Sequence, residues 1–243
     1  MLKIFNRSSS NIKDEAIDTD SVYYQDNSNE FYDEYYDDLI SSGAIGFVAG
    51  IYHKQLENGH DKKYPLCLEL GAGSGQHFKF VKHDFDVYIS SDLRTPKAHL
   101  DLMEDSRVKF QVLDAQELSA IESESIDRLI VTCVLPHLSD PEAALKEWRR
   151  VLKPGGVLDV YVPCEPSILL DIAQRLTTKR KVEKLGLKYE KIRYRGHRNH
   201  YPYLKMLLES TFNSENIKVK HFPIGIRYWQ FSLWSTFRIT KST

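Results

Sequence analysis

Short apolar runs alternate with amphipathic segments through the middle of the chain. The apolar runs have the length and composition of buried strands and cover residues 65–70, 86–91, 108–113, 126–133 and 156–162. The segments between them have helical spacing or helix start signals and cover residues 75–83, 96–103, 116–121 and 141–152. Because strands that alternate with helices form parallel sheets covered on both faces, the pattern predicts a doubly wound α/β fold.

The segment before this region is acidic and aromatic. Ten acids and no lysine or arginine lie in residues 14–38. Phe31, Tyr35 and Leu39 recur every four residues, which predicts an amphipathic helix with an aromatic face. That face either docks on the core, or a tyrosine such as Tyr36 closes over a ligand.

The segment after the fifth strand is basic. Ten lysines and arginines lie in residues 175–203, opposed only by Glu183 and Glu190. Helices are predicted around it at 167–176 and 201–212. Two antiparallel strands are predicted to follow at 217–224 and 228–239, and the second has apolar residues on both faces, as a central strand would.

This pattern divides the chain into two parts. We expect residues 1–60 to form a mobile tail and a helical cap, including a helix near 47–56. Residues 61–243 then form the main domain, with a basic insertion at about 165–212. A length of 243 residues and a hydrophobic content of 42% suit one elaborated domain with a sizeable core.

Cysteine usage and hydropathy bear on location. Cys67, Cys133 and Cys164 are widely spaced and form no Cys-x-x-Cys pair, which favours reduced thiols in a cytoplasmic protein and predicts no metal site. No run approaches the roughly 18 apolar residues that a membrane helix needs. We therefore expect a protein without a membrane span; the sequence leaves its oligomeric state open.

A glycine-rich turn follows the first predicted strand. Glu69 ends the strand, and Gly71, Ala72, Gly73 and Gly75 follow it. A turn of this kind lets the backbone approach an adenosine-containing ligand at the carboxyl end of a strand. The spacing is Gly-x-Gly-x-Gly, and position 76, where a dinucleotide-binding turn has its last glycine, is a glutamine.

Matching residues follow at the ends of the next strands. Asp92 and Leu93 end the second strand, where an acid can hold a ribose diol. Asp114 and Ala115 end the third, Cys133 and Val134 end the fourth, and Lys153-Pro154-Gly155-Gly156 turns the chain into the fifth.

Together these motifs resemble those of class I methyltransferases that use S-adenosyl-L-methionine (SAM), over about residues 65–163. The resemblance implies a Rossmann-like methyltransferase fold with a seven-stranded sheet whose last two segments form an antiparallel pair. It also implies SAM as cofactor, S-adenosyl-L-homocysteine as product, and SAM binding by the residues just named: Glu69, Gly71, Ala72, Gly73, Gly75, Asp92, Leu93, Asp114, Ala115, Cys133 and Val134.

The sequence indicates less about the acceptor, the molecule that receives the methyl group. His137 follows the fourth strand, where related enzymes place residues that face the methyl group, and is a candidate general base or a structural histidine. His197 and His200 are weaker candidates. Arg193, Arg195 and Arg198, with His200, form a candidate site for an anionic acceptor, or part of a solvated lid.

An oxygen of a nucleotide-linked sugar, a phosphorylated metabolite or a glycan precursor is the acceptor that this sequence favours. The main alternative is an RNA methyltransferase that docks through residues 175–203, although the acidic N-terminal segment makes nucleic acid an unfavoured partner. Further alternatives are a nicotinamide (NAD) oxidoreductase and a non-catalytic scaffold.

Overall fold

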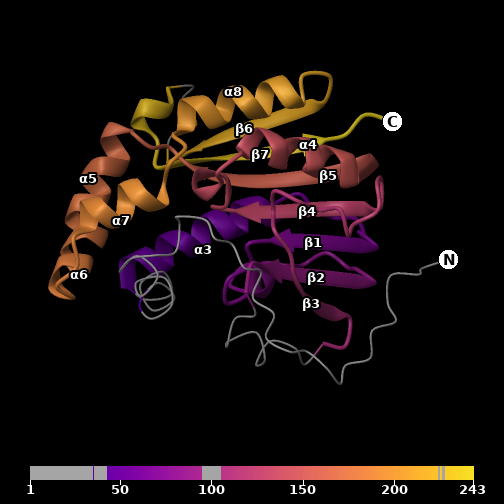
Figure 1. Ribbon diagram of the computed structural model, residues 1–243, viewed down its shortest axis with the longest axis horizontal. Helices are drawn as coiled ribbons and strands as arrows, with labels where there is room; N and C mark the ends of the chain where they lie inside the picture. Colours follow the sequence, from indigo (N-terminus) through magenta and orange to yellow (C-terminus); the bar gives the residue numbers. More distant parts are fainter. Residues whose placement is uncertain (1–34, 36–42, 95–104, 224, 226–227) are drawn as a thin grey trace.

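A single open sheet runs through the centre of the molecule (Figure 1). The computed structural model describes residue 35 and residues 43–94, 105–223, 225 and 228–243. The sheet order is β3-β2-β1-β4-β5-β7-β6. Its strands are β1 (Leu66–Leu70), β2 (Val87–Asp92), β3 (Val108–Val112), β4 (Ile126–Thr132), β5 (Leu152–Pro163), β6 (Asn216–Phe222) and β7 (Trp234–Thr240). β1 to β5 pair in parallel, and β7 pairs antiparallel with both β5 and β6, which confirms the predicted seven-stranded, mostly parallel sheet.

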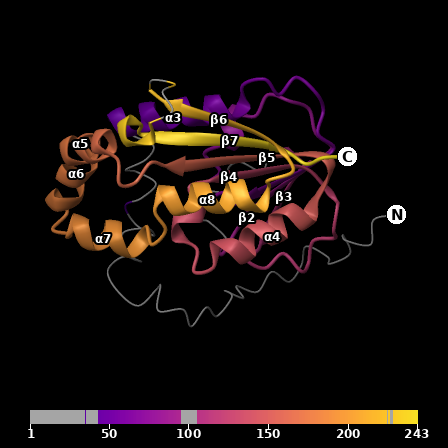
Figure 2. The same ribbon diagram turned by 90° about the horizontal axis from the view of Figure 1, so that it is seen from above.

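Helices cover both faces of the sheet and its carboxyl edge. α4 (Pro141–Val151) and α8 (Tyr201–Thr211) lie on one face, and α3 (Gly43–Glu57) lies on the other (Figure 2). Three shorter helices, α5 (Ile168–Leu176), α6 (Thr178–Lys184) and α7 (Tyr189–Gly196), lie beyond the carboxyl ends of the parallel strands in both views. None of the helices within the described ranges is long and apolar enough to cross a bilayer.

The face under α4 and α8 has an apolar core. Leu129 and Leu158 of the sheet and Trp148 of α4 are fully buried in one cluster. α4 begins where the sequence predicts, because the Asp140 carboxylate accepts a hydrogen bond from Ala143 N (2.9 Å) and Pro141 occupies the first turn.

The face under α3 instead buries a charged network. The Arg128 guanidinium is fully buried and contacts Glu57 Oε1 at 2.7 Å and Asp159 Oδ2 at 2.9 Å. His60 Nε2 lies 2.7 Å from the same Asp159 oxygen, and Arg238 Nε lies 2.7 Å from the other. This network holds the end of α3 against β4, β5 and β7.

Three predicted elements are wrong. Residues 75–83 form turns and the short 3-10 helix η2 (Phe78–Phe80), because His77 is buried and bound through Nε2 to Glu57 Oε1 at 2.9 Å. Residues 116–121 form turns. The start of the predicted strand 228–239 is the 3-10 helix η5 (Trp229–Phe231).

Some predicted elements lie outside the described residues. These are the helix at 96–103, together with Phe31, Tyr36 and Leu39 of the acidic segment. Tyr35 is described, and it packs against Val182, Tyr189 and Ile192 of the insertion. For Tyr35, this contact fits the docking interpretation of the aromatic face.

Candidate active site

The glycine turn joins β1 to its neighbours at the carboxyl edge. Gly71 has a φ of +65°, and a Cβ built on it would lie 2.3 Å from Val134 Cγ2 at the end of β4. Gly73 also has a positive φ, but a Cβ there meets nothing within 4 Å. Packing against Val134 therefore requires a glycine at position 71, whereas the space beside Gly73 is open and can hold a ligand.

Glu69 lies buried directly behind this turn. Its Oε2 accepts a hydrogen bond from Tyr88 OH at 2.7 Å, whereas Oε1 is buried without a hydrogen-bond partner in the described structure. Burial raises the pKa of Glu69. A buried acceptor without a donor is costly, so Oε1 is suited to receive a cationic donor from a ligand.

Asp92 is oriented by the same turn. Its Oδ2 accepts from Gly73 N at 2.8 Å and its Oδ1 accepts from Leu93 N at 2.7 Å. Each carboxylate oxygen can accept a second hydrogen bond, which is what a ribose diol requires. Burial raises the pKa of Asp92 against the effect of these backbone donors.

Asp114 and Ala115 lie at the end of β3. Asp114 Oδ1 accepts from Gln116 N at 2.8 Å and holds the turn that replaces the predicted helix. The Ala115 carbonyl accepts from Trp148 Nε1 at 2.8 Å, which fixes the backbone of this loop on α4.

A thiol and an imidazole follow β4. Cys133 has a φ of +61°, which is uncommon for a residue with a side chain, and belongs to the tight turn before η4 (Leu135–His137). His137 is partly buried at the end of η4. Burial, followed by the charge of the nearby His197, lowers the pKa of His137 to about 3.

Residues 197–201 of the insertion are bound to this turn. Arg198 N and Asn199 N both donate to Pro136 O, at 2.9 and 3.1 Å. The Asn199 amide donates to Leu138 O at 2.7 Å, and Tyr201 N donates to Glu165 O at 2.8 Å. The end of α7 is therefore fixed beside the carboxyl end of β4.

This arrangement brings His197 between an acid and a thiol. His197 Nδ1 lies 2.7 Å from Glu165 Oε2, and its ring is 4.7 Å from the His137 ring, centroid to centroid. Burial would lower the pKa of His197, but the charge of Glu165 and hydrogen bonds with Cys133 and Glu165 raise it to about 10. Burial would raise the pKa of Glu165, and the charge of His197 instead lowers it to about 2.

The predicted anion-binding residues have different surroundings. Arg193 is nearly buried, with Nε 3.3 Å from Glu165 Oε1 and a terminal nitrogen 3.0 Å from Asp171 Oδ1. Arg195, Arg198 and His200 are exposed. Arg193 thus connects α7 to α5 and to Glu165, whereas Arg195 of α7 and Arg198, which is bound to η4 through its backbone, are exposed.

Sequence reasoning missed Glu165 and Tyr52. Glu165 follows β5, in a position without any motif. Tyr52 of α3 lies close enough to Cys133 and Glu69 for both charges to act on it, and its ring is 4.1 Å from that of Tyr161. Burial, followed by these two groups, raises the pKa of Tyr52. Its place on the third turn of a helix distant from the motifs carried no local signal.

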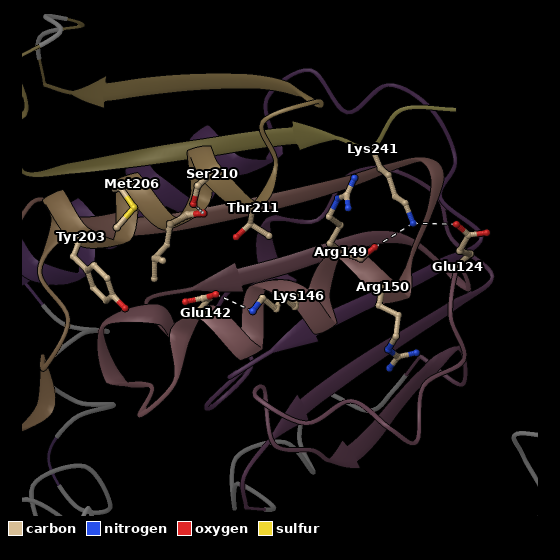
Figure 3. Close-up of a pocket in the computed structure, with 11 residues that line it drawn as sticks. Glu124, Glu142, Lys146, Arg149, Arg150, Tyr203, Met206, Ser210, Thr211 and Lys241 are labelled. Atoms are coloured by element: carbon tan, nitrogen blue, oxygen red, sulfur yellow. Dashed lines mark hydrogen bonds and ion pairs between the residues drawn. The ribbon is translucent and has the colours of Figure 1, made fainter.

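A groove of about 860 Å³ lies elsewhere, between α4 and α8 (Figure 3). Its lining cations are all paired with carboxylates of the chain: Lys146 with Glu142, Arg149 with Glu215, Arg150 with Glu147 and Lys241 with Glu124. It contains none of the residues at the carboxyl edge.

An open sheet of this order, with a glycine turn and acids at the ends of successive strands, defines a Rossmann-like domain that binds an adenosine cofactor. Residues 68–160 match the family described as "Methyltransferase domain". These residues therefore form a methyltransferase domain whose cofactor is SAM, within the fold of the class I SAM-dependent methyltransferases.

Three known proteins illustrate the likeness. The human thiol S-methyltransferase TMT1B is 32% identical over 102 residues, which cover 37% of this chain and 39% of that protein. The protein in complex with the Trm112 methyltransferase activator of Haloferax volcanii has a TM-score of 0.62 at 12% identity, over 96% of this chain and 100% of that one. Phosphoethanolamine N-methyltransferase 2 of Haemonchus contortus, solved with SAM, has a TM-score of 0.57 at 13% identity, over 89% and 60%. The last two likenesses concern the fold.

The residues at the carboxyl edge fit this cofactor. The buried Glu69 Oε1 lacks a partner and suits an amino group, and the space over Gly73 is open. SAM supplies a methyl group on a positively charged sulfur, and the chain supplies the surface that orients it against an acceptor.

Proposed function

We propose that this chain transfers a methyl group from SAM to a small anionic acceptor bound between η4 and the basic insertion. The carrying observation is the attachment of Arg198 and Asn199 to Pro136 and Leu138, beside the glycine turn. Arg198 belongs to that attachment and Arg195 precedes it at the end of α7; both are exposed and suit a phosphate or carboxylate. In this proposal Glu69, Asp92 and Asp114 hold the cofactor, with Gly71–Gly75 and Cys133-Val134.

An oxygen acceptor remains the first candidate, as the sequence favours. In that case His137 is the candidate base. The likeness to a thiol S-methyltransferase, together with the thiol and two imidazoles at the end of β4, favours sulfur as the second candidate. The three unpaired cysteines support our proposal of a cytoplasmic location.

The experiment that tests this function follows release of S-adenosylhomocysteine with a panel of phosphorylated metabolites, nucleotide sugars and small thiols. We expect turnover with at least one acidic member. The double variant Arg195→Ala, Arg198→Ala should raise the KM for that acceptor at least about tenfold, because two charge-assisted hydrogen bonds are lost. SAM affinity, measured by calorimetry, should not change.

The matched control removes two exposed cations at the far end of the insertion, Lys184→Ala with Lys188→Ala. This variant should keep the KM of the parent chain. Equal effects of the two double variants would mean that only net charge matters and would contradict a local acceptor site.

A further inference from the structure

Three metal-ligating side chains converge at the end of β4. The ligand atoms of Cys133, His137 and His197 all lie within 4.8 Å of one another, and all three residues are partly buried. No metal site is predicted from the sequence, because its cysteines are widely spaced. In the structure, two of these residues come from one turn and the third from the end of α7, far along the chain.

We propose that Cys133 Sγ and one ring nitrogen each of His137 and His197 bind a single zinc ion. Thiolate and imidazole are the donors that Zn²⁺ prefers, whereas Mg²⁺ and Ca²⁺ require oxygen. Three protein ligands leave the fourth tetrahedral position open, which is the arrangement of catalytic zinc sites.

The ligand atoms lie within 4.8 Å of one another, somewhat farther apart than on a bound ion. Zinc lies about 2.3 Å from sulfur and about 2.1 Å from nitrogen, so at tetrahedral angles two of its ligand atoms lie roughly 3.4–3.6 Å apart. Side-chain rotations that shorten the separations by up to about 1.4 Å close the cluster. The backbone needs no change, because hydrogen bonds to Pro136 already hold the turn and the insertion together.

A supporting residue is already in place. His197 Nδ1 is bound to Glu165 Oε2 at 2.7 Å, which leaves Nε2 for the metal. Glu165 Oε1 in turn accepts from the Gln174 amide at 2.9 Å and lies 3.3 Å from Arg193 Nε. A carboxylate that orients a ligating histidine is the usual second partner in zinc sites, and here it is itself fixed on two sides.

The position of the site gives the zinc ion a role in methyl transfer, and this role rests on the proposed function. The cluster lies beside the glycine turn, where the methyl donor is expected. An acceptor thiol that occupies the fourth position loses its proton to water and binds as a thiolate. The thiolate then forms the S–CH₃ bond as the donor's sulfonium–methyl bond breaks, and a neutral thioether and S-adenosylhomocysteine leave. A zinc ion at this position therefore favours the second of the two candidate acceptors, and the acceptor class that this proposal names is a small anionic thiol.

Cobalt is the probe that tests the site. The metal-stripped full chain is titrated with Co²⁺, and we expect one equivalent to give the visible bands of a tetrahedral ion and a sulfur-to-cobalt charge-transfer band, both removed by Zn²⁺. Cys133→Ala should abolish the charge-transfer band. Glu165→Gln should weaken metal binding about 10–100-fold, and His137→Ala and His197→Ala should weaken it more because each removes a ligand.

Two cysteines provide matched controls. Cys67 and Cys164 are buried, and burial raises the pKa of each to about 12. Cys67→Ala and Cys164→Ala should leave the cobalt spectrum unchanged. Circular dichroism and SAM calorimetry on every variant separate loss of the ion from loss of the fold.

Two results would overturn the zinc site. In the first, the parent chain shows no charge-transfer band, and Zn²⁺ does not slow the alkylation of Cys133. The three residues Cys133, His197 and Glu165 would then form a hydrogen-bond chain without a metal. In the second, the band survives Cys133→Ala. Zinc binding without any effect of zinc on thiol methylation would retain the site and refute its proposed use. If the parent chain does not bind SAM, the proposed function is refuted but the zinc site is not.

Discussion

Three glycines with similar backbone conformations differ in what surrounds them. Gly71, Gly73 and Gly186 all have positive φ, between 53° and 77°. Only Gly71 has a side chain, that of Val134, in the space where a Cβ would go. Gly73 faces open space in the candidate site, and Gly186 faces open space at the end of α6. Substitutions at the three positions can therefore distinguish the effects of backbone strain, of side-chain packing and of ligand access.

Alanine at each position should give three distinct results. Gly186→Ala should cost about 1–2 kcal/mol of unfolding free energy, since it introduces only left-handed strain. Gly71→Ala should cost clearly more, because Cβ would overlap Val134. Gly73→Ala should cost as little as Gly186→Ala yet weaken SAM binding at least about tenfold.

Urea unfolding and SAM calorimetry measure both quantities on the same samples. Unchanged SAM affinity in Gly73→Ala would contradict a cofactor over this glycine.

At the scale of elements, the helices of the insertion are linked by ion pairs that differ in burial. Asp171 of α5 pairs with Arg193 of α7 and with Arg175 of its own helix. Arg193 is 9% exposed in its side chain, whereas Arg175 is 70% exposed. The two arginines thus share a partner and differ in burial.

Removal of each arginine should therefore have different costs. Arg193→Ala leaves Glu165 with one partner fewer in a buried site and should lower the unfolding free energy by about 1.5–3 kcal/mol. Arg175→Ala removes an exposed pair and should cost less than about 1 kcal/mol. Thermal and urea unfolding of the two variants check this difference, and equal losses would mean that α7 is held mainly by its apolar contacts.

Local patterns predicted the strands and failed where distant contacts decide. β1, β2, β3 and β4 were predicted to within one residue at each end, because apolar runs between turn signals determine them. The segment after Gly75 was predicted as a helix, but the buried contact of His77 with Glu57, made by α3, holds it as a turn.

The candidate site likewise contains residues that the sequence could identify and residues that depend on distant contacts. Glu69, Asp92 and Asp114 could be chosen from the sequence because each ends a strand. The approach of Glu165 and His197 to Cys133 depends on how the insertion folds back, which no local spacing encodes. The sequence could identify Arg193 as a cation but not that Glu165 and Asp171 would neutralise it.

At the scale of the molecule, α3 and the sheet are joined by charges that acid should disrupt. Burial would raise the pKa of Glu57, but the hydrogen bond from His77 and the charge of Arg128 lower it to about 2. Burial would likewise raise the pKa of Asp159, and Arg128 and His60 lower it. Burial, with the charge of His77, lowers the pKa of His53 to about 3.

These shifts share one sign. In each case the unfolded chain binds protons at a higher pH than the folded chain, so stability falls as pH falls. His53 should contribute to the loss below about pH 6.5, and Glu57 should contribute between about pH 4.5 and pH 2. The expected contribution of these three groups is a decrease in unfolding free energy as the pH falls below 6.5, against which the raised pKa values of Glu69 and Asp92 act.

Glu57→Gln isolates the carboxylate. Urea unfolding at a series of pH values should show a shallower decline below pH 4.5 than in the parent chain, with a lower stability at pH 7 because Arg128 loses one of its two carboxylate partners. An unaltered slope below pH 4.5 would mean that Glu57 does not contribute to the acid sensitivity.

The place of β7 also has a consequence for the order of synthesis. β7 lies between β5 and β6, although β6 precedes it in the chain. When β6 leaves the ribosome its only neighbour does not yet exist, and the edge of β5 stays unpaired until β7 emerges between them. An unpaired edge next to a buried strand invites association with other chains. The translation of β7 therefore ends the period in which this edge of the nascent sheet is most exposed to aggregation.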